Sequence, residues 1–116
     1  MIAVAEVAVP RAEAIARLND QLRKNGTGGS VMVTQGVLAI AGYNSAELAE
    51  ALAAYDAFDA DNDPHGERDF GDLTLWGEDL FWKLDYYSPD LRYGSDDPAD
   101  PDNTRRVLTV MLTSEW

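Results

Sequence analysis

Residues 70–87 read FGDLTLWGEDLFWKLDYY, and this stretch decides the fold. Its two halves, residues 70–76 and 80–87, are rich in the aromatic and aliphatic side chains that favour β-strands. Gly77 and Glu78 lie between them and suit a tight hairpin turn. The stretch therefore predicts two neighbouring antiparallel strands, and the rest of the chain can be placed around them.

Alternation within the second strand predicts which face of the sheet is covered. One face would carry Leu80, Trp82, Leu84 and Tyr86, and the other Phe81, Lys83, Asp85 and Tyr87. Because successive side chains of a strand point to opposite faces, we expect helices on the first face and a partly open second face. A later strand, residues 104–113, is apolar on both faces over residues 107–112 and should be central in the sheet.

Two helices are predicted before the hairpin. Residues 10–24 carry a narrow apolar stripe of Ile15, Leu18 and Leu22 at helical spacing, and Gly26 ends the helix. The second helix has Asn44 as its N-cap and Glu47 three residues on, as in a capping box. Its apolar face is formed by Leu48, Leu52 and Tyr55.

Between these helices a short strand is predicted over residues 31–34. Gln35 and Gly36 interrupt it, and residues 37–40 would continue it past a bulge. Together the elements predict one α+β domain over residues 1–116. In it, two helices pack on one face of a mainly antiparallel sheet of four to five strands.

The ends and composition of the chain bear on its location. The apolar start, residues 1–9, contains Glu6 and lacks a basic leading segment, so we expect a strand or ordered tail rather than a signal peptide. No apolar run approaches the ~18 residues of a membrane span. The chain has no cysteine, which excludes disulfides, thiolate metal sites and a cysteine nucleophile. A soluble cytoplasmic protein is expected.

The net negative charge belongs to one segment. Residues 56–102 hold 15 of the 21 acidic residues and three of the nine basic ones, which accounts for the whole net charge of −12. The rest of the chain is neutral. This asymmetry argues against direct binding to nucleic acid or an anionic membrane, and favours cations or a basic protein surface as partners. We expect function to lie on this segment and on its two loops, residues 59–69 and 88–103.

Several unusual blocks recur in a known order: DNDPHGERDFG at 61–71, FWKLDYY at 81–87, GSDDPADP at 94–101 and RVLTVML at 106–112. Over roughly residues 15–116 the chain resembles the bacterial family catalogued as domain of unknown function 3768. The resemblance implies a bacterial cytoplasmic protein and supplies no activity. The family's pattern has Tyr where this chain has His65, which argues against a metal role for that histidine.

One candidate site is a cluster at alternate positions of the first acidic loop. Its members are Asp59, Asp61, Asp63, His65, Glu67 and Asp69. An extended segment would point them to one side, and Asp61, Asp63, His65 and Glu67 could then hold a divalent cation as a cofactor. The alternative is a solvated loop whose aspartates bond their own backbone.

A second candidate is the pair of Lys83 and Asp85 on one strand face, beside Tyr86 and Tyr87. Lysine and carboxylate at this spacing could transfer a proton, or could form an ordinary exposed ion pair. No catalytic residue is assigned, and the sequence favours a non-enzymatic protein.

The leading hypothesis is an acidic binding module that engages a basic protein surface. A sharper form is nucleic-acid mimicry, as in an inhibitor of a defence nuclease. Aromatic anchors would come from Phe70, Trp76, Tyr86, Tyr87 and Tyr93. The predicted binding residues are Asp59, Asp61, Asp63, Glu67, Asp69, Asp85, Tyr86, Tyr87, Asp96 and Asp97.

Two other functional hypotheses stay open. One is a metal-binding protein or metal-dependent enzyme that uses the carboxylate and histidine cluster at residues 61–67. The other is a domain that is acidic for solubility and acts only as a subunit or homodimer.

Overall fold

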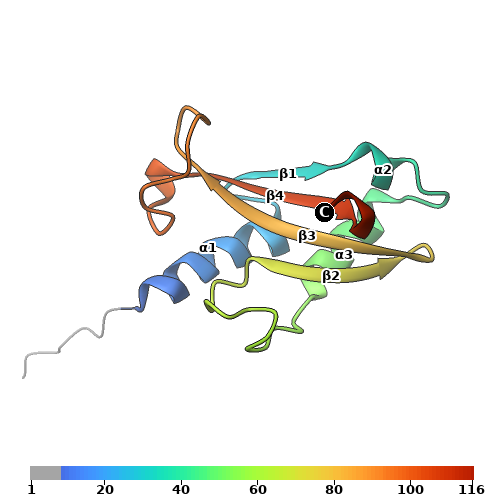
Figure 1. Ribbon diagram of the computed structural model, residues 1–116, viewed down its shortest axis with the longest axis horizontal. Helices are drawn as coiled ribbons and strands as arrows, with labels where there is room; N and C mark the ends of the chain where they lie inside the picture. Colours follow the sequence, from blue (N-terminus) through green and yellow to red (C-terminus); the bar gives the residue numbers. More distant parts are fainter. Residues whose placement is uncertain (1–8) are drawn as a thin grey trace, which may run out of the picture.

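A four-stranded sheet with strand order β1-β4-β3-β2 forms the centre of the protein, as a computed structural model of residues 9–116 describes it (Figure 1). The strand or tail expected at the start of the chain lies outside the described residues, apart from Val9. The helices are α1 (Arg11–Asn25), α2 (Gln35–Leu38) and α3 (Ser45–Ala54). The strands are β1 (Ser30–Val33), β2 (Phe70–Leu75), β3 (Glu78–Tyr87) and β4 (Arg105–Leu112). Short 3₁₀ turns occupy Pro101–Asn103 and Thr113–Glu115.

The predicted α+β fold is confirmed, and the sheet is mixed. Strands β2, β3 and β4 pair antiparallel, whereas β1 runs parallel to β4. Strand β4 is central, as its apolar faces predicted. A parallel pair needs a long crossover connection, and residues 34–104 between β1 and β4 supply it.

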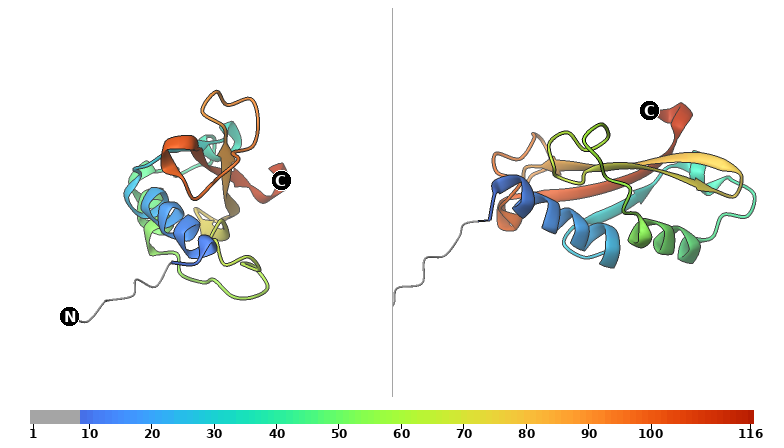
Figure 2. Two further views of the ribbon diagram at one scale, coloured as in Figure 1. Left: turned by 90° about the vertical axis from the view of Figure 1, so that its left-hand side faces the viewer. Right: turned by 90° about the horizontal axis from the view of Figure 1, so that it is seen from below.

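Helices α1 and α3 cover one face of the sheet (Figure 2). The predicted inward side chains of β3, Leu80, Trp82 and Leu84, are buried beneath them. Full burial of such a side chain stabilises the fold by about 1.5 to 3 kcal/mol. The core is completed by Ile15 and Leu22 of α1, Leu48 and Leu52 of α3, and Leu108 and Val110 of β4.

No helix packs on the opposite face of the sheet within the described residues. One end of that face is covered by Trp116, whose ring meets Phe70 and Phe81 with centroids 5.3 Å and 5.7 Å away. Beyond this aromatic cluster the face stays accessible, as the mixed character of Phe81, Lys83 and Asp85 predicted.

The hairpin turn between β2 and β3 lies one residue earlier than predicted. Its two central residues are Trp76 and Gly77, both at positive φ (54° and 76°), as a type I′ turn requires. This backbone region costs a bulky residue about 1 to 2 kcal/mol. Tertiary contacts offset the cost, because the Trp76 ring packs edge-on against Tyr43 at 5.3 Å and its Nε1 donates to Glu47 at 2.8 Å.

The expected continuation of β1 over residues 37–40 is wrong, because the chain turns into the short helix α2 there. The Thr34 hydroxyl accepts a hydrogen bond from the Val37 amide at 3.4 Å and so caps this helix. Helical geometry then buries Val37 in the core. A short apolar run cannot distinguish a strand from one buried helical turn.

Two long loops lie on either side of the first half of α1 (Figures 1 and 2). Residues 55–69 connect α3 to β2, and residues 88–104 connect β3 to β4. Arg11 of α1 pairs with Asp97 of the second loop at 3.4 Å, and Glu13 pairs with Arg68 of the first at 3.2 Å. We call residues 56–69 and 90–102 together the acidic end.

Candidate functional site

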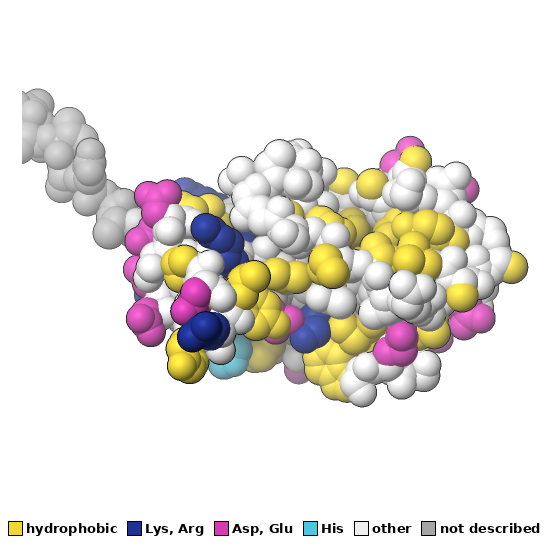
Figure 3. Space-filling model, turned by 90° about the horizontal axis from the view of Figure 1, so that it is seen from above, with side chains coloured by type: hydrophobic (Ala, Val, Ile, Leu, Met, Phe, Trp, Pro, Cys, Tyr) yellow, Lys and Arg dark blue, Asp and Glu magenta, His cyan; other side chains and the backbone are white. Residues whose placement is uncertain are grey.

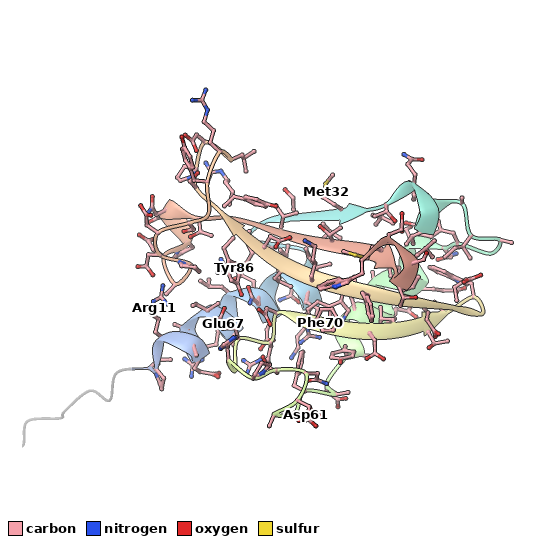
Figure 4. The ribbon with its side chains drawn as sticks, in the orientation of Figure 1. Arg11, Met32, Asp61, Glu67, Phe70 and Tyr86 are labelled. Atoms are coloured by element: carbon pink, nitrogen blue, oxygen red, sulfur yellow. The ribbon has the colours of Figure 1, made fainter. Side chains whose placement is uncertain are left out.

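A hydrogen-bonded network of buried and half-buried polar groups joins the acidic end to the core. The amide nitrogen of Asn19 donates to the Tyr86 hydroxyl at 2.8 Å and to the backbone oxygen of Glu67 at 2.9 Å. The Tyr86 hydroxyl donates in turn to Oε1 of Glu67 at 2.9 Å. Figure 4 shows Glu67 and Tyr86 pointing toward one another. These hydrogen bonds thus fix the first acidic loop to α1 and β3.

Arg106 of β4 extends this hydrogen-bonded network. Its Nε donates to Oδ1 of Asn19 at 2.6 Å, and its terminal nitrogen donates to the backbone oxygen of Pro98. The guanidinium lies over the Tyr86 ring, 5.1 Å from the centroid. Burial lowers the pKa of Arg106, and the negative charge of Glu67 opposes that shift. One buried cation therefore ties the second acidic loop to the same network.

Tyr86 acts as a neutral hydrogen-bond donor in this setting. Burial raises the pKa of its hydroxyl, and the hydrogen bond to Glu67 raises it further. A tyrosine with a raised pKa keeps its proton at neutral pH, so it is a poor base or nucleophile. The network is built to hold the loops in place.

Arg68 forms a second anchor for the first loop. Its backbone is left-handed (φ 52°), and its side chain reaches back to α1. Nε lies 3.0 Å from both carboxylate oxygens of Asp20, and the terminal nitrogens lie 3.2 Å and 3.3 Å from the oxygens of Glu13. Hydrogen bonds with Asp20, then with Glu13, raise the pKa of Arg68, and the Arg68 hydrogen bond lowers the pKa of Glu13.

Aspartates within the loops hold their own turns. Oδ1 of Asp59 accepts from the amides of Asp61 and Asn62, each at 2.9 Å. Asp63 accepts from the Arg68 amide at 3.0 Å. In the second loop the same role falls to Asp90, Asp97 and Asp100, each accepting from an amide two residues on. Apart from the Asp63 contact, these are the Asx turns that short acidic loops favour.

The predicted metal ligands do not converge. Glu67 turns inward to Tyr86, and Asp63 holds the Arg68 amide, while Asp61 lies at the tip of the loop (Figure 4). Within residues 9–116 no three histidine, aspartate or glutamate side chains are grouped to hold a metal ion. The structure thus does not bring together the predicted set of Asp61, Asp63, His65 and Glu67. The loop is coiled by turns, so alternate residues do not share a side.

The predicted binding residues separate into three places. Asp59, Asp61, Asp63, Asp96 and Asp97 lie at the acidic end. Glu67 and Tyr86 belong to the buried network, and Asp69 lies half-buried beside them, where burial raises its pKa. Asp85 and Tyr87 lie on the open sheet face, where Asp85 forms an ion pair with Lys83 at 2.7 Å. Tyr86 and Tyr87 therefore serve opposite faces of the sheet.

A groove of about 840 Å³ lies where the second acidic loop meets the open sheet face. Its lining includes the apolar side chains of Met32, Tyr87, Leu91 and Val107, together with Arg105. Leu91 and Tyr93 project from the loop beside it, with 61% and 72% of their surface exposed.

A family model described as "Protein of unknown function (DUF3768)" matches residues 33–115. The chain belongs to this family. The DUF3768 match covers both acidic loops and three of the four strands, so the predicted resemblance is confirmed. No curated protein and no solved structure shows a significant match. Within the described part of the chain, no helix has the length and apolar character needed to cross a bilayer.

Sequence reasoning missed the residues that anchor the DUF3768 loops. Asn19 sits on the apolar stripe of α1 between Ile15 and Leu22, and a polar residue at a core position is a readable signal. Arg106 likewise lies at a buried, helix-facing position of β4, as Leu108 and Val110 do. Arg68 gave no such signal, because its partners lie 48 and 55 residues away.

Proposed function

We propose that this protein is a small non-enzymatic binding module whose acidic end engages a basic protein surface. One observation carries the proposal. Of the eleven acidic residues at the acidic end, only Asp97 forms an ion pair within the described chain. Ten carboxylates are thus left without a cationic partner there. Such a surface attracts a basic partner and speeds its association.

Fixed presentation of the charge supports specific recognition. The loops are held by Asx turns and by the anchors of Arg68, Glu67 and Arg106, each of which reaches α1 or the sheet. A partner therefore meets carboxylates whose positions are already set, and less conformational entropy is lost on binding.

Exposed apolar side chains supply contacts that charge alone lacks. Leu91 and Tyr93 stand on a turn closed by hydrogen bonds between Ser88 and Tyr93, one at 2.8 Å and one at 3.2 Å. Of the predicted aromatic anchors, Trp76 and Tyr86 are engaged within the fold. Tyr93, with its neighbour Leu91, is therefore the best-placed anchor beside the acids.

Nucleic-acid mimicry is the sharper form of the proposal. Rigidly held carboxylates can imitate phosphates and occupy the cleft of a basic nucleic-acid-binding protein, such as a defence nuclease. We place this activity in the bacterial cytoplasm, because a chain without cysteine suits a reducing compartment.

The test compares two doubly neutralised variants of equal charge. Asp61→Asn/Asp102→Asn changes exposed carboxylates of the two acidic loops, and Glu50→Gln/Glu78→Gln changes two exposed carboxylates elsewhere. The immobilised wild-type chain should capture a basic protein at about 50 mM salt and release it at about 200 mM. The captured protein is then purified, and displacement of labelled duplex DNA from it by the chain is followed by fluorescence anisotropy.

The loop variant should bind that partner at least about threefold more weakly, which corresponds to a modest charge effect. The matched control should bind like wild type. Equal binding by both variants, or binding that does not weaken with salt, would refute the proposal. Binding without displacement of DNA would refute mimicry alone.

A further inference from the structure

A charge-free stretch forms one side of this strongly acidic protein. Between Lys24 and Glu47 the sequence contains no charged residue, and these positions build β1, α2 and the turns around them. Figure 3 views the molecule from this side. Uncharged and hydrophobic side chains fill the middle of that view, and acidic groups gather mainly at the end where residues 88–104 lie.

The two edges of the sheet differ in how they are protected. Edge strands expose unpaired backbone groups, and proteins usually guard them with charge, proline or a bulge. Strand β2 follows this rule, because Asp72 is exposed along it and Glu78 and Asp79 flank its end. Strand β1 has none of these guards. Val31 and Met32 are 41% and 56% exposed on it.

Backbone groups of β1 point outward at two positions. The Thr34 amide donates to the backbone oxygen of Val110 in β4 at 3.1 Å. Because alternate residues of a strand direct their amides to opposite edges, those of Val31 and Val33 face away from β4. Within residues 9–116 no strand pairs with this edge.

Apolar hollows flank β1 on both faces of the sheet. On the open face Met32 lines the groove of about 840 Å³ already described. On the helix face Val31 and Val33 line a second, mainly apolar hollow of about 320 Å³, whose walls also include Tyr43, Leu48 and the basic residues Arg23 and Lys24. Side chains of an added strand alternate between the two faces, so both hollows could receive them.

We infer that β1 pairs antiparallel with β1 of a second copy of this chain. The charge argues for a second copy. Two chains of net charge −12 repel one another, and the side formed by residues 25–46 lets them meet without opposing like charges. A two-fold axis at Met32 pairs the outward groups of Val31 with those of Val33 in the second copy. The two sheets then become one continuous sheet, with four strands from each copy.

Solution mass tests this pairing directly. Wild type should sediment at twice the mass of one chain, and the dimer should tighten as salt screens the repulsion. Met32→Lys places a charge at the exposed edge and should give the single-chain mass at the same concentration. Tyr93→Lys makes the same charge change at an exposed position away from β1, and should stay dimeric. A single-chain mass for wild type at about 100 μM, or a dimer that survives Met32→Lys, would overturn the inference; this concentration far exceeds that needed for a micromolar dimer.

A disulfide between the two copies at residue 32 tests the position of the two-fold axis. In the inferred register the two Met32 residues face each other as a non-hydrogen-bonded pair, with Cα atoms about 4.5 Å apart, which suits a disulfide. The chain has no cysteine, so Met32→Cys introduces the only thiol. It should oxidise to a covalent dimer under conditions in which Glu50→Cys does not. Equal cross-linking of the two variants would contradict the pairing.

Hydrogen exchange of backbone amides distinguishes loss of strand pairing from disruption of the fold by the Met32→Lys substitution. The Val31 and Val33 amides should exchange slowly in wild type and rapidly in Met32→Lys. The Thr34 amide, which bonds within the chain, should stay protected in both. Rapid exchange at Val31 and Val33 in concentrated wild type would exclude strand pairing. The opposite salt dependence distinguishes this dimer from the proposed binding of a basic partner.

Discussion

The hydroxyl of Tyr86 donates a 2.9 Å hydrogen bond to Oε1 of Glu67, and this contact joins a central strand to the acidic loop. Asn19 donates to the same hydroxyl and links it to Arg106 of β4. Acidic loops on a protein of net charge −12 repel themselves. The network keeps them in place against that repulsion.

Replacing Tyr86 by Phe should destabilise the fold by about 1 to 3 kcal/mol. The change leaves the half-buried Glu67 carboxylate without its donor, and the desolvation cost of that group is then not offset. Urea unfolding at pH 7 measures the loss. Tyr87→Phe is the control, because no hydrogen bond of its hydroxyl exists within the described chain, and its effect should stay within about 0.5 kcal/mol. Equal losses for the two variants would remove the network's structural role.

Leu91→Asn should stabilise the protein and weaken partner binding together. Leu91 has a positive φ of 64°, which costs a leucine about 1 kcal/mol and suits asparagine better. Little packing is lost, since the side chain is 61% exposed. Thermal unfolding should therefore show a gain of up to about 1 kcal/mol. Tyr93→Asn, in the same turn without a positive φ, should show no gain. A loss of stability in Leu91→Asn would contradict the strain argument.

Asp69→Asn should make the protein more stable at neutral pH and leave it unchanged in acid. Burial raises the pKa of Asp69 above its ordinary value of 3.8, and the nearby carboxylates of Glu67 and Asp63 add to the shift. The protonated form is thus favoured in the folded state. Wild type loses this advantage as pH rises from about 3.8 through the raised pKa, whereas asparagine never ionises.

The measurement for Asp69 is the free energy of unfolding of both proteins across that pH range. The difference should be near zero below the unfolded value of 3.8, grow as pH rises, and become constant above the raised pKa. Asp61→Asn, a change at an exposed loop tip, should show no such trend. A difference independent of pH would show that burial of the charge is not its cause.

Local sequence patterns predicted much of the fold. Alternation along residues 80–87 identified the buried face of β3, and Asn44 identified the start of α3, where its Oδ1 accepts from two amides at 3.0 Å. Where the patterns were short they failed. The run at residues 37–40 begins in the last two residues of helix α2 and continues as a turn. The hairpin turn shifted onto Trp76 because contacts with Tyr43 and Glu47 support it there.

The candidate site depended on contacts that no local pattern records. Asn19 and Glu67 are 48 residues apart, and Arg106 and Asn19 are 87 residues apart. Alternate spacing suggested that residues 59–69 share a side, but an Asx turn at Asp59 and the hydrogen bond from the Arg68 amide to Asp63 coil the loop. Local hydrogen bonds thus replaced the extended geometry on which a metal site would have depended.

The sequence by itself determined that the net charge lies in residues 56–102 and that residues 25–46 have no charged side chain, because charge is a property of residue identity alone. It also determined the α+β class, since period-two and helical patterns follow from local backbone geometry. Only the tertiary structure decided that Asn19, Glu67, Tyr86 and Arg106 meet, and that β1 is an edge strand. Those relationships arise when distant segments bury their surfaces against one another, and chain order does not specify which edge remains free.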